Sequence, residues 1–239
     1  MLHDSEVQRV LVVTAHPDDV DFGAGGTVAS WVDSGIEVAY CICTDGQAGG
    51  ADHDVPREQI PGIRRAEQTA AGMALGVRDI RFLGHIDGRL EPTYDLRKEI
   101  VRVIRQVRPD RMLIQSPERN WDRIAASHPD HLAAGEAAMQ AVYPDARNPF
   151  AMTDLLAEEG LEPWTVREVW LMATPHPTHH VDVTDTFERK MAALRAHASQ
   201  TGHMDDLEGF IRGWSERLAA DAGLAEGRLA EAFRVVATG

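Results

Sequence analysis

The sequence predicts an α/β fold: a mostly parallel, Rossmann-like sheet with helices on both faces. Apolar, β-branched runs alternate with segments of helical periodicity through the first half of the chain. The first of these runs, residues 9–15, shows no polar alternation, which is typical of a parallel strand that is buried on both faces. Because strand-to-helix alternation combines with right-handed crossovers, these patterns predict a doubly wound sheet.

The elements of the first half are expected in strict alternation. In chain order they are a strand over 9–15, a glycine-rich turn over 21–26, a helix over 27–34, a strand over 37–44, a helix over 63–75, a strand over 79–83, a helix over 95–107, a strand over 111–115 and a helix over 130–142. Residues 45–61 are expected to be a long polar loop, of the kind that forms a lid or is disordered.

The second half is expected to add shorter elements. These are strands over 168–173 and 180–183, helices over 186–199 and 206–220, and a segment over 231–236 that fits either a strand or a helix. The chain shows no internal repeat, low-complexity tract or linker. We therefore expect residues 1–239 to form a single domain.

Composition and charge exclude several classes of protein. The chain has 24 lysines and arginines against 38 aspartates and glutamates, a formal net charge of −14 that would repel a phosphate backbone, so nucleic acid is not expected as a partner. No apolar run approaches the roughly 20 residues that a membrane span needs. The polar, acidic N-terminus does not resemble a secretory signal, and we expect a cytoplasmic location.

Two cysteines, Cys41 and Cys43, lie in one expected strand, where their spacing places both on the same face. Two thiols so close in sequence exclude a disulfide framework. A fragment of a metal site is the weaker interpretation, because no second thiol pair exists, and we expect both cysteines in the core.

Two short motifs follow the ends of expected strands. His16-Pro17-Asp18-Asp19 comes directly after the first strand, and His128-Pro129-Asp130-His131 comes after the loop that follows the fourth. In a doubly wound sheet these two strands are neighbours at the point where the winding reverses, and ligands bind in the crevice outside their carboxyl ends. Imidazoles and carboxylates are costly to bury unpaired, so their convergence predicts a metal site.

The ligand set can be proposed from the residues themselves. His16 and Asp19 can reach one ion and leave Asp18 free beside it, while His131 can supply a third ligand. Three nitrogen and oxygen ligands leave room for water, as in catalytic sites, and suit zinc or ferrous iron better than magnesium. A single His-Pro-Asp tripeptide is more often structural, but two at adjacent strand ends favour a functional site.

These motifs resemble the signatures of the PIG-L (LmbE-like) family of metal-dependent N-acetylglucosaminyl deacetylases. The Ala-His-Pro-Asp-Asp signature stands at 15–19 and the His-Pro-Asp-His signature at 128–131. Further shared features are Arg64 with Glu67, Leu75-Gly76, and a His-x-Ser-Gln segment at 197–200. The resemblance therefore covers most of the chain.

The resemblance implies a role for each site residue. His16, Asp19 and His131 would bind one divalent metal, with zinc expected first and ferrous iron as the alternative. Asp18 would be the general base, His128 would polarise or protonate the scissile group, and Arg64 would contact the substrate. A divalent ion lowers the pKa of a bound water from about 15.7 toward about 7, so that water can attack an acetamide carbonyl and release acetate.

The substrate implied by the resemblance is a small N-acetylated amino sugar or sugar conjugate, and relatives in the family are often oligomeric. Two positions depart from the family pattern. Val20 stands where glutamate is usual, and Asp21, one residue later, points in another direction on a regular backbone. Ala126-Ser127 stands where the deacetylase of mycothiol biosynthesis has Tyr-Gly, which weakens an assignment to that substrate.

Several residues have competing interpretations. Arg64 fits a solvated ion pair with Glu67 or Glu58 as well as a substrate contact. His197 fits a hydrogen-bonded core histidine better than a ligand. His176, His179 and His180 fit a loop rim or a subunit contact better than a second metal site. Asp45 could line the pocket, and Trp121 could stack on a sugar ring.

Alternative functions also remain open. An amidase acting on a sugar–cysteine conjugate or another acyl amide would use the same chemistry. A nucleotide-binding module is disfavoured, because Val28 stands where a G-x-G-x-x-G motif needs its third glycine. A non-catalytic metal-binding protein would keep the ligands and lack turnover.

Overall fold

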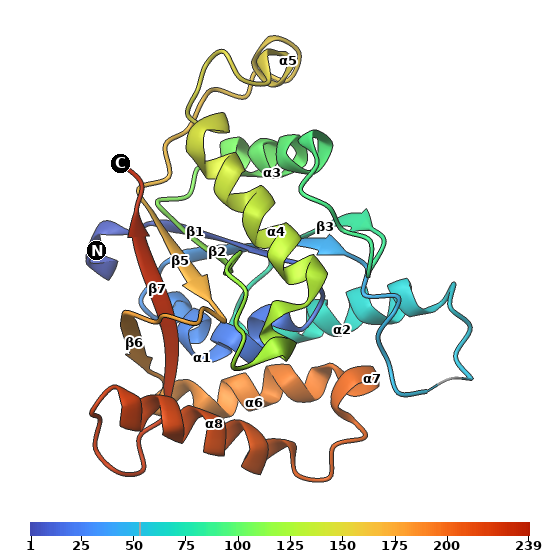
Figure 1. The fold of residues 1–239 in the computed structure, drawn as a ribbon, viewed down its shortest axis with the longest axis vertical. Helices are drawn as coiled ribbons and strands as arrows, with labels where there is room; N and C mark the ends of the chain where they lie inside the picture. The colour runs from blue at the N-terminus through green and yellow to red at the C-terminus, as the bar shows by residue number, and fades with distance from the viewer. Residues whose placement is uncertain (53) are drawn as a thin grey trace.

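The computed structural model describes residues 1–52 and 54–239, and a seven-stranded sheet lies at its centre (Figure 1). The strands are β1 (Arg9–Thr14), β2 (Glu37–Thr44), β3 (Asp79–His85), β4 (Arg111–Gln115), β5 (Glu168–Met172), β6 (His179–Asp182) and β7 (Ala230–Ala237). Their order is β3-β2-β1-β4-β5-β7-β6. The first five are parallel, whereas β7 runs antiparallel to both β5 and β6. The predicted α/β class is confirmed.

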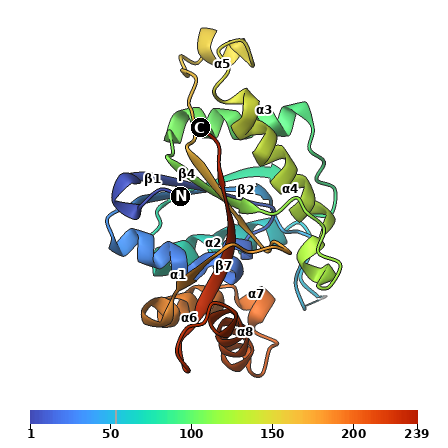
Figure 2. The same cartoon turned by 60° about the vertical axis from the view of Figure 1, so that its left-hand side comes forward.

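Helices cover both faces of this sheet. The helices of the described residues are α1 (Asp19–Asp33), α2 (Ile60–Leu75), α3 (Tyr94–Val107), α4 (Pro129–Gln140), α5 (Thr153–Ala157), α6 (Phe187–Ala196), α7 (Ala198–Thr201) and α8 (Leu207–Asp221), of which α5 projects away from the sheet. Figures 1 and 2 show α3 and α4 on one side of the sheet and α1 and α2 on the other, with α6 and α8 forming a further layer beyond α1 and α2.

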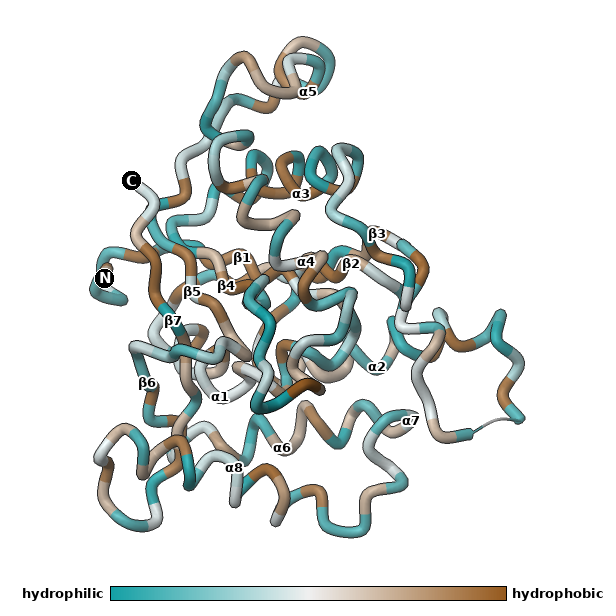
Figure 3. Tube along the Cα trace, viewed as in Figure 1, coloured by the Kyte–Doolittle hydropathy of each residue, from teal (hydrophilic) through white to brown (hydrophobic). Residues whose placement is uncertain are grey.

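The core is divided by the sheet into two apolar layers. Along β1, Leu11 and Val13 pack toward α3 and α4, whereas Val10 and Val12 pack toward α1 and α2. A third, smaller cluster joins α6 to α8. The apolar strands in the centre of the trace stand out in Figure 3. This burial on both faces explains why β1 has no polar alternation.

The glycine-rich segment over 21–26 is helical, so the predicted turn is wrong. Helix α1 begins at Asp19, well before the expected start at residue 27. A Cβ on Gly23 would lie 2.6 Å from Met172 Sδ, and one on Gly26 would lie 2.6 Å from Val183 Cβ. These glycines therefore allow α1 to pack closely against the end of β5 and the segment before α6, rather than reverse the chain.

Other boundaries differ for local reasons. Helix α2 starts at Ile60, so the expected loop over 45–61 is shorter than predicted; residue 53 of that loop lies outside the described residues. The expected helix over 186–199 is divided at His197, whose ψ of 56° is not helical. The ambiguous segment near the C-terminus is the strand β7, which enters the sheet between β5 and β6.

Two expectations about composition can be compared with the structure. Cys41 and Cys43 are free, buried and part of the same apolar layer, as predicted. Within residues 1–52 and 54–239, no helix combines the length and apolarity needed to cross a bilayer.

Candidate active site

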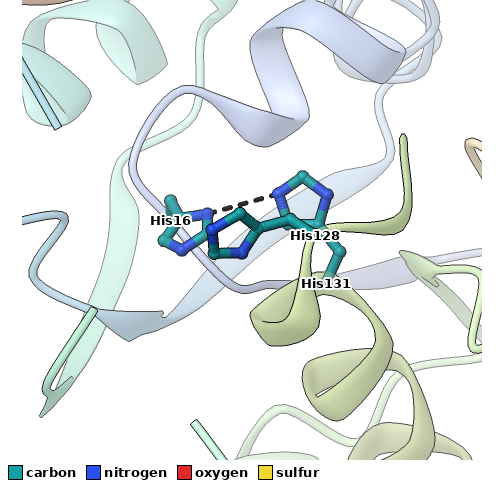
Figure 4. Close-up of side chains that lie close together, drawn as sticks. All are labelled: His16, His128 and His131. Atoms are coloured by element: carbon teal, nitrogen blue, oxygen red, sulfur yellow. Dashed lines mark hydrogen bonds between the residues drawn. The ribbon is translucent and has the colours of Figure 1, made fainter. Parts of the chain in front are cut away.

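The two motifs meet at the carboxyl ends of β1 and β4, which are adjacent parallel strands. His16 lies in the turn between β1 and α1, and His128 and His131 lie at the start of α4. The three imidazole rings face one another in Figure 4, with ring centroids 4.9–5.3 Å apart. The two motifs therefore meet as predicted, although His16 and His131 are 115 residues apart in the sequence.

The three predicted ligands lie within reach of one ion. His16 Nδ1 lies 3.4 Å from Asp19 Oδ2 and 3.3 Å from His131 Nε2, and Asp19 Oδ1 lies 3.0 Å from His131 Nε2. In a tetrahedral zinc site with bonds of about 2.0–2.1 Å, neighbouring ligand atoms are about 3.3 Å apart. The spacing and the chemistry of this donor set therefore fit a small divalent cation.

The second ring nitrogen of His16 faces two carboxylates that the sequence analysis did not single out as functional. His16 Nε2 lies 3.1 Å from Asp130 Oδ2 and 3.0 Å from Asp87 Oδ1. A hydrogen on Nε2 leaves the Nδ1 lone pair free for an ion, the arrangement that outer carboxylates enforce on metal-binding histidines. Asp130 also accepts hydrogen bonds from the backbone nitrogens of Gly88 and Leu90, so it joins the loop after β3 to the site.

The carboxylates make this place favourable for positive charge. Burial lowers the pKa of His16, but Asp19, Asp130 and Asp87 raise it, and the resulting pKa is about 12. Burial also lowers the pKa of His131, and Asp19 raises it above its ordinary value. Burial raises the pKa of Asp19, but His131 and His16 outweigh this and hold the pKa well below its usual range. The charges around His16, Asp19 and His131 therefore favour a bound cation.

Asp18 lies beside the three predicted ligands in an uncommon backbone conformation. Its φ of 96° and ψ of −28° fall in the left-handed region, which a residue with a side chain rarely adopts. Burial raises the pKa of Asp18, Arg64 lowers it and Asp19 raises it, and the result is a pKa of about 6. A carboxylate with this pKa is ionised at neutral pH and can accept a proton from a neighbouring water.

Arg64 is buried against Asp18, so its interpretation as a solvated ion pair with Glu67 or Glu58 is wrong. The Arg64 side chain is 3% exposed, and its Nη2 lies 3.0 Å from Asp18 Oδ2 and also donates to the Pro17 carbonyl. These contacts place Arg64 on the side of α2 that faces the site. Glu67 instead accepts hydrogen bonds from Ser199. A contact between Arg64 and substrate stays a prediction.

A hydrogen bond to one ring nitrogen of His128 leaves the other ring nitrogen as a donor. Its Nδ1 accepts from the backbone nitrogen of Asp130 at 3.2 Å, so a neutral ring carries its hydrogen on Nε2. Burial and the neighbouring His16 and His131 lower the pKa of His128. The ring is partly exposed. It can therefore offer Nε2–H to a ligand in the crevice.

The remaining candidates lie in different surroundings. His197 is a buried core histidine, as predicted, with Nε2 2.8 Å from Asp21 Oδ2. Asp45 pairs with Arg65 at 2.7 Å. Among the described residues, the only clusters suited to a metal contain His16, so the group around His179 and His180 on β6 forms no second site there. Trp121 is 80% exposed, and Arg119 lies over its ring.

Sequence reasoning gave no role in the site to four residues: Asp21, Gln68, Asp87 and Asp130. Asp130 stands inside the second motif, and Asp87 follows the third strand at the same edge of the sheet, so position alone could have indicated both. Gln68 Oε1 accepts from the backbone nitrogen of Asp18 at 2.8 Å, and nothing in the sequence signals this contact. Val20, where the family usually has glutamate, is fully buried in the core.

Comparisons with known proteins agree with this geometry. The profile of the PIG-L family, described as GlcNAc-PI de-N-acetylase, matches residues 11–142. The diacetylchitobiose deacetylase of Thermococcus kodakarensis is 37% identical over 82% of this chain and 71% of its own length. A probable N-acetyl-alpha-D-glucosaminyl L-malate deacetylase 2 of Bacillus cereus is 34% identical over 82% of this chain and 86% of its own.

A solved structure is similar throughout. The N,N'-diacetylchitobiose deacetylase of Pyrococcus horikoshii, in complex with its inhibitor MPG, superimposes with a TM-score of 0.87 at 32% sequence identity. The match covers 98% of this chain and 85% of that one. The similarity therefore includes the antiparallel strands and the C-terminal helices as well as the motif-bearing half.

Proposed function

Because this chain belongs to the PIG-L family, we propose that it is a metal-dependent deacetylase that acts on an N-acetylated amino sugar or sugar conjugate. Family membership confirms the resemblance that the two motifs indicated, and the three relatives described above are named as deacetylases, enzymes that hydrolyse N-acetyl bonds. The observation that carries the proposal is the meeting of His16, Asp19 and His131 within 3.0–3.4 Å of one another, beside Asp18.

His16, Asp19 and His131 would hold the metal. Zinc fits their nitrogen and oxygen donors, and ferrous iron is the alternative, because both accept imidazole and carboxylate ligands. When bound, a divalent ion polarises a carbonyl oxygen and makes a coordinated water more acidic. The fixed Nδ1 lone pair of His16 supports this assignment.

Asp18 would accept the proton of the attacking water. Its pKa of about 6 keeps the carboxylate ionised at neutral pH, and its ion pair with Arg64 fixes the side chain in place. The water oxygen then bonds to the acetamide carbon. Asp18 can return the proton to the departing nitrogen, so that breakage of the carbon–nitrogen bond yields acetate and a free amine.

His128 would donate from Nε2 to the carbonyl oxygen as negative charge develops on it. A neutral imidazole performs this role as an N–H donor, and its hydrogen bond from Asp130 orients the ring. Loss of one such donor typically slows catalysis by about 100–1000-fold. The same geometry serves any acetamide, so these residues account for the reaction and leave the rest of the substrate to the surrounding loops.

The substrate class is proposed from what named relatives share. Diacetylchitobiose and N-acetylglucosaminyl malate, in the names of the relatives, both contain an N-acetylglucosamine unit. An amidase acting on a sugar–cysteine conjugate is the alternative within the same chemistry. A nucleotide-binding module is less well supported, because Gly23 and Gly26 pack against Met172 and Val183, and the carboxylates of Asp19, Asp87 and Asp130 lie around His16 at the strand ends.

Acetate release tests the proposal. The purified chain is stripped with a chelator, reloaded with zinc or, anaerobically, with ferrous iron, and incubated with N,N'-diacetylchitobiose or N-acetylglucosaminyl malate. We expect acetate from the reloaded protein, little from the stripped protein, and loss of both metal and activity in His131→Ala. His176→Ala, on an exposed loop, is the matched control. Metal binding without acetate from either substrate or from a sugar–cysteine amide would support the non-catalytic alternative.

A further inference from the structure

We propose that three buried polar residues, Asp21, Gln68 and His197, act together as positioning residues that hold Asp18 in its active conformation. The inference rests on the proposed function, since it concerns the base of that reaction. The three side chains come from α1, from α2 and from the junction of α6 and α7, and all are fully buried. None of them is among the residues assigned to metal binding or to chemistry above.

The three side chains form one hydrogen-bonded chain that ends at Asp18. His197 Nε2 lies 2.8 Å from Asp21 Oδ2, and Gln68 Nε2 donates to the same oxygen at 2.9 Å. The other end of the Gln68 amide accepts from the backbone nitrogen of Asp18 at 2.8 Å. The chain therefore connects the C-terminal layer of the protein to the turn that carries the first motif.

The direction of each hydrogen bond is fixed by Asp21. Its Oδ2 accepts from the NH₂ group of Gln68 at 2.9 Å and lies 2.8 Å from Nε2 of His197, so both partners present nitrogen to the same carboxylate oxygen. This orients the Gln68 carbonyl toward the Asp18 nitrogen. Without Asp21 the amide of Gln68 would lose its preferred orientation, and a flipped amide would present a donor to the backbone N–H of Asp18.

The left-handed backbone at Asp18 explains why such support is needed. A residue with a side chain stays at a φ of 96° only when its surroundings over-determine it. Arg64 and Gln68 are four residues apart on α2 and therefore share one face of that helix. Arg64 pairs with the carboxylate of Asp18, and Gln68 accepts from the backbone nitrogen of Asp18, so α2 contacts the proposed base at two points.

Packing alone does not explain this cluster. Asp21 Oδ1 and His197 Nδ1 are buried and have no hydrogen-bond partner in the part of the chain that the structure describes. Buried polar atoms without partners oppose folding, and apolar side chains of similar volume would fill the same space without that cost. The arrangement is instead accounted for by the hydrogen bond that it delivers to Asp18.

Gln68→Met tests the proposal, because methionine has a similar volume and its thioether sulfur is only a weak acceptor for the Asp18 hydrogen bond. We expect kcat to fall by about 10–100-fold, with metal content unchanged and KM nearly unchanged. Glu168→Gln is the matched control, because it disrupts a buried ion pair away from the site. The pair, Arg111–Glu168 at 2.7 Å, lies at the amino ends of β4 and β5. We expect this variant to lose thermal stability and to keep kcat.

Amide hydrogen exchange gives a readout that does not depend on turnover. In Gln68→Met the backbone amide of Asp18 should exchange at least about tenfold faster, while the amides of β1 keep their protection. If the wild type releases no acetate, the proposed function fails, but this exchange measurement still tests the hydrogen bond. Unchanged protection of Asp18, or a wild-type kcat in Gln68→Met, would overturn the proposal.

A conservative variant separates positioning from stability. His197→Gln can still donate to Asp21, whereas His197→Leu cannot. We expect His197→Leu to lower kcat and to speed exchange of the Asp18 amide, and His197→Gln to restore most of both. Equal kcat losses in the two variants, in proportion to their losses of thermal stability, would show that His197 serves the fold alone.

Discussion

His16 and Asp130 join the two motifs directly, with His16 Nε2 3.1 Å from Asp130 Oδ2. Asp130 is fully buried and also accepts from the backbone nitrogens of Gly88 and Leu90. One carboxylate therefore ties together the ends of β1, β3 and β4. It also fixes which nitrogen of His16 faces Asp19 and His131, so the second motif orients the metal ligand that we propose in the first motif.

Replacing Asp130 should weaken metal binding without removing a ligand. In Asp130→Ala, His16 loses a hydrogen-bond partner that orients its ring, and outer carboxylates of this kind typically contribute about 10–100-fold to affinity. We expect a loss of that size in competition titrations against a chelator. Asp145→Asn is the matched control, a buried carboxylate paired with Arg97 away from the site. Equal affinity in wild type and Asp130→Ala would contradict this role.

Catalysis should depend on the protonation of Asp18. Because the pKa of Asp18 is about 6 and only the ionised form accepts a proton, kcat should fall about tenfold per pH unit below this value. In Asp18→Asn we expect residual activity without this acid limb. If kcat of Asp18→Asn still falls at low pH, the titration belongs to another group.

The parts of the fold that were predicted depend on contiguous patterns. The strand β1 and the motif after it are read from neighbouring residues, and the topology rule then places β1 beside β4. This was sufficient to bring His16, Asp19 and His131 together. The topology rule alone did not predict the roles of Asp130 and Asp87, because these roles depend on which nitrogen of His16 each carboxylate faces.

The remainder depends on contacts that sequence patterns do not encode. Gln68 and His197 meet at Asp21 across separations of 47 and 176 residues. The glycines of α1 were interpreted as a turn, because a glycine that allows close helix packing and one that reverses the chain look the same in sequence. Only the neighbours Met172 and Val183, from distant elements, distinguish the two cases.

Metal removal should lower the stability of the folded chain. A ligand that binds only the native state stabilises it by about 2.7 kcal/mol at one hundred times its dissociation constant. We expect the melting temperature to rise when zinc or ferrous iron is added to stripped protein, and to stay constant in His131→Ala. A similar rise in both would place the stabilising ion elsewhere.

Arg64→Met should move the acid limb of kcat to higher pH. An adjacent arginine typically lowers the pKa of an aspartate by about 1–3 pH units, so without it Asp18 should protonate at higher pH. Arg64→Lys keeps the positive charge and should shift the limb less. Both proteins are compared well below their melting temperatures, because removing one partner of a buried ion pair destabilises the fold. If Arg64 acts only through the substrate, KM will rise and the limb will stay where it is.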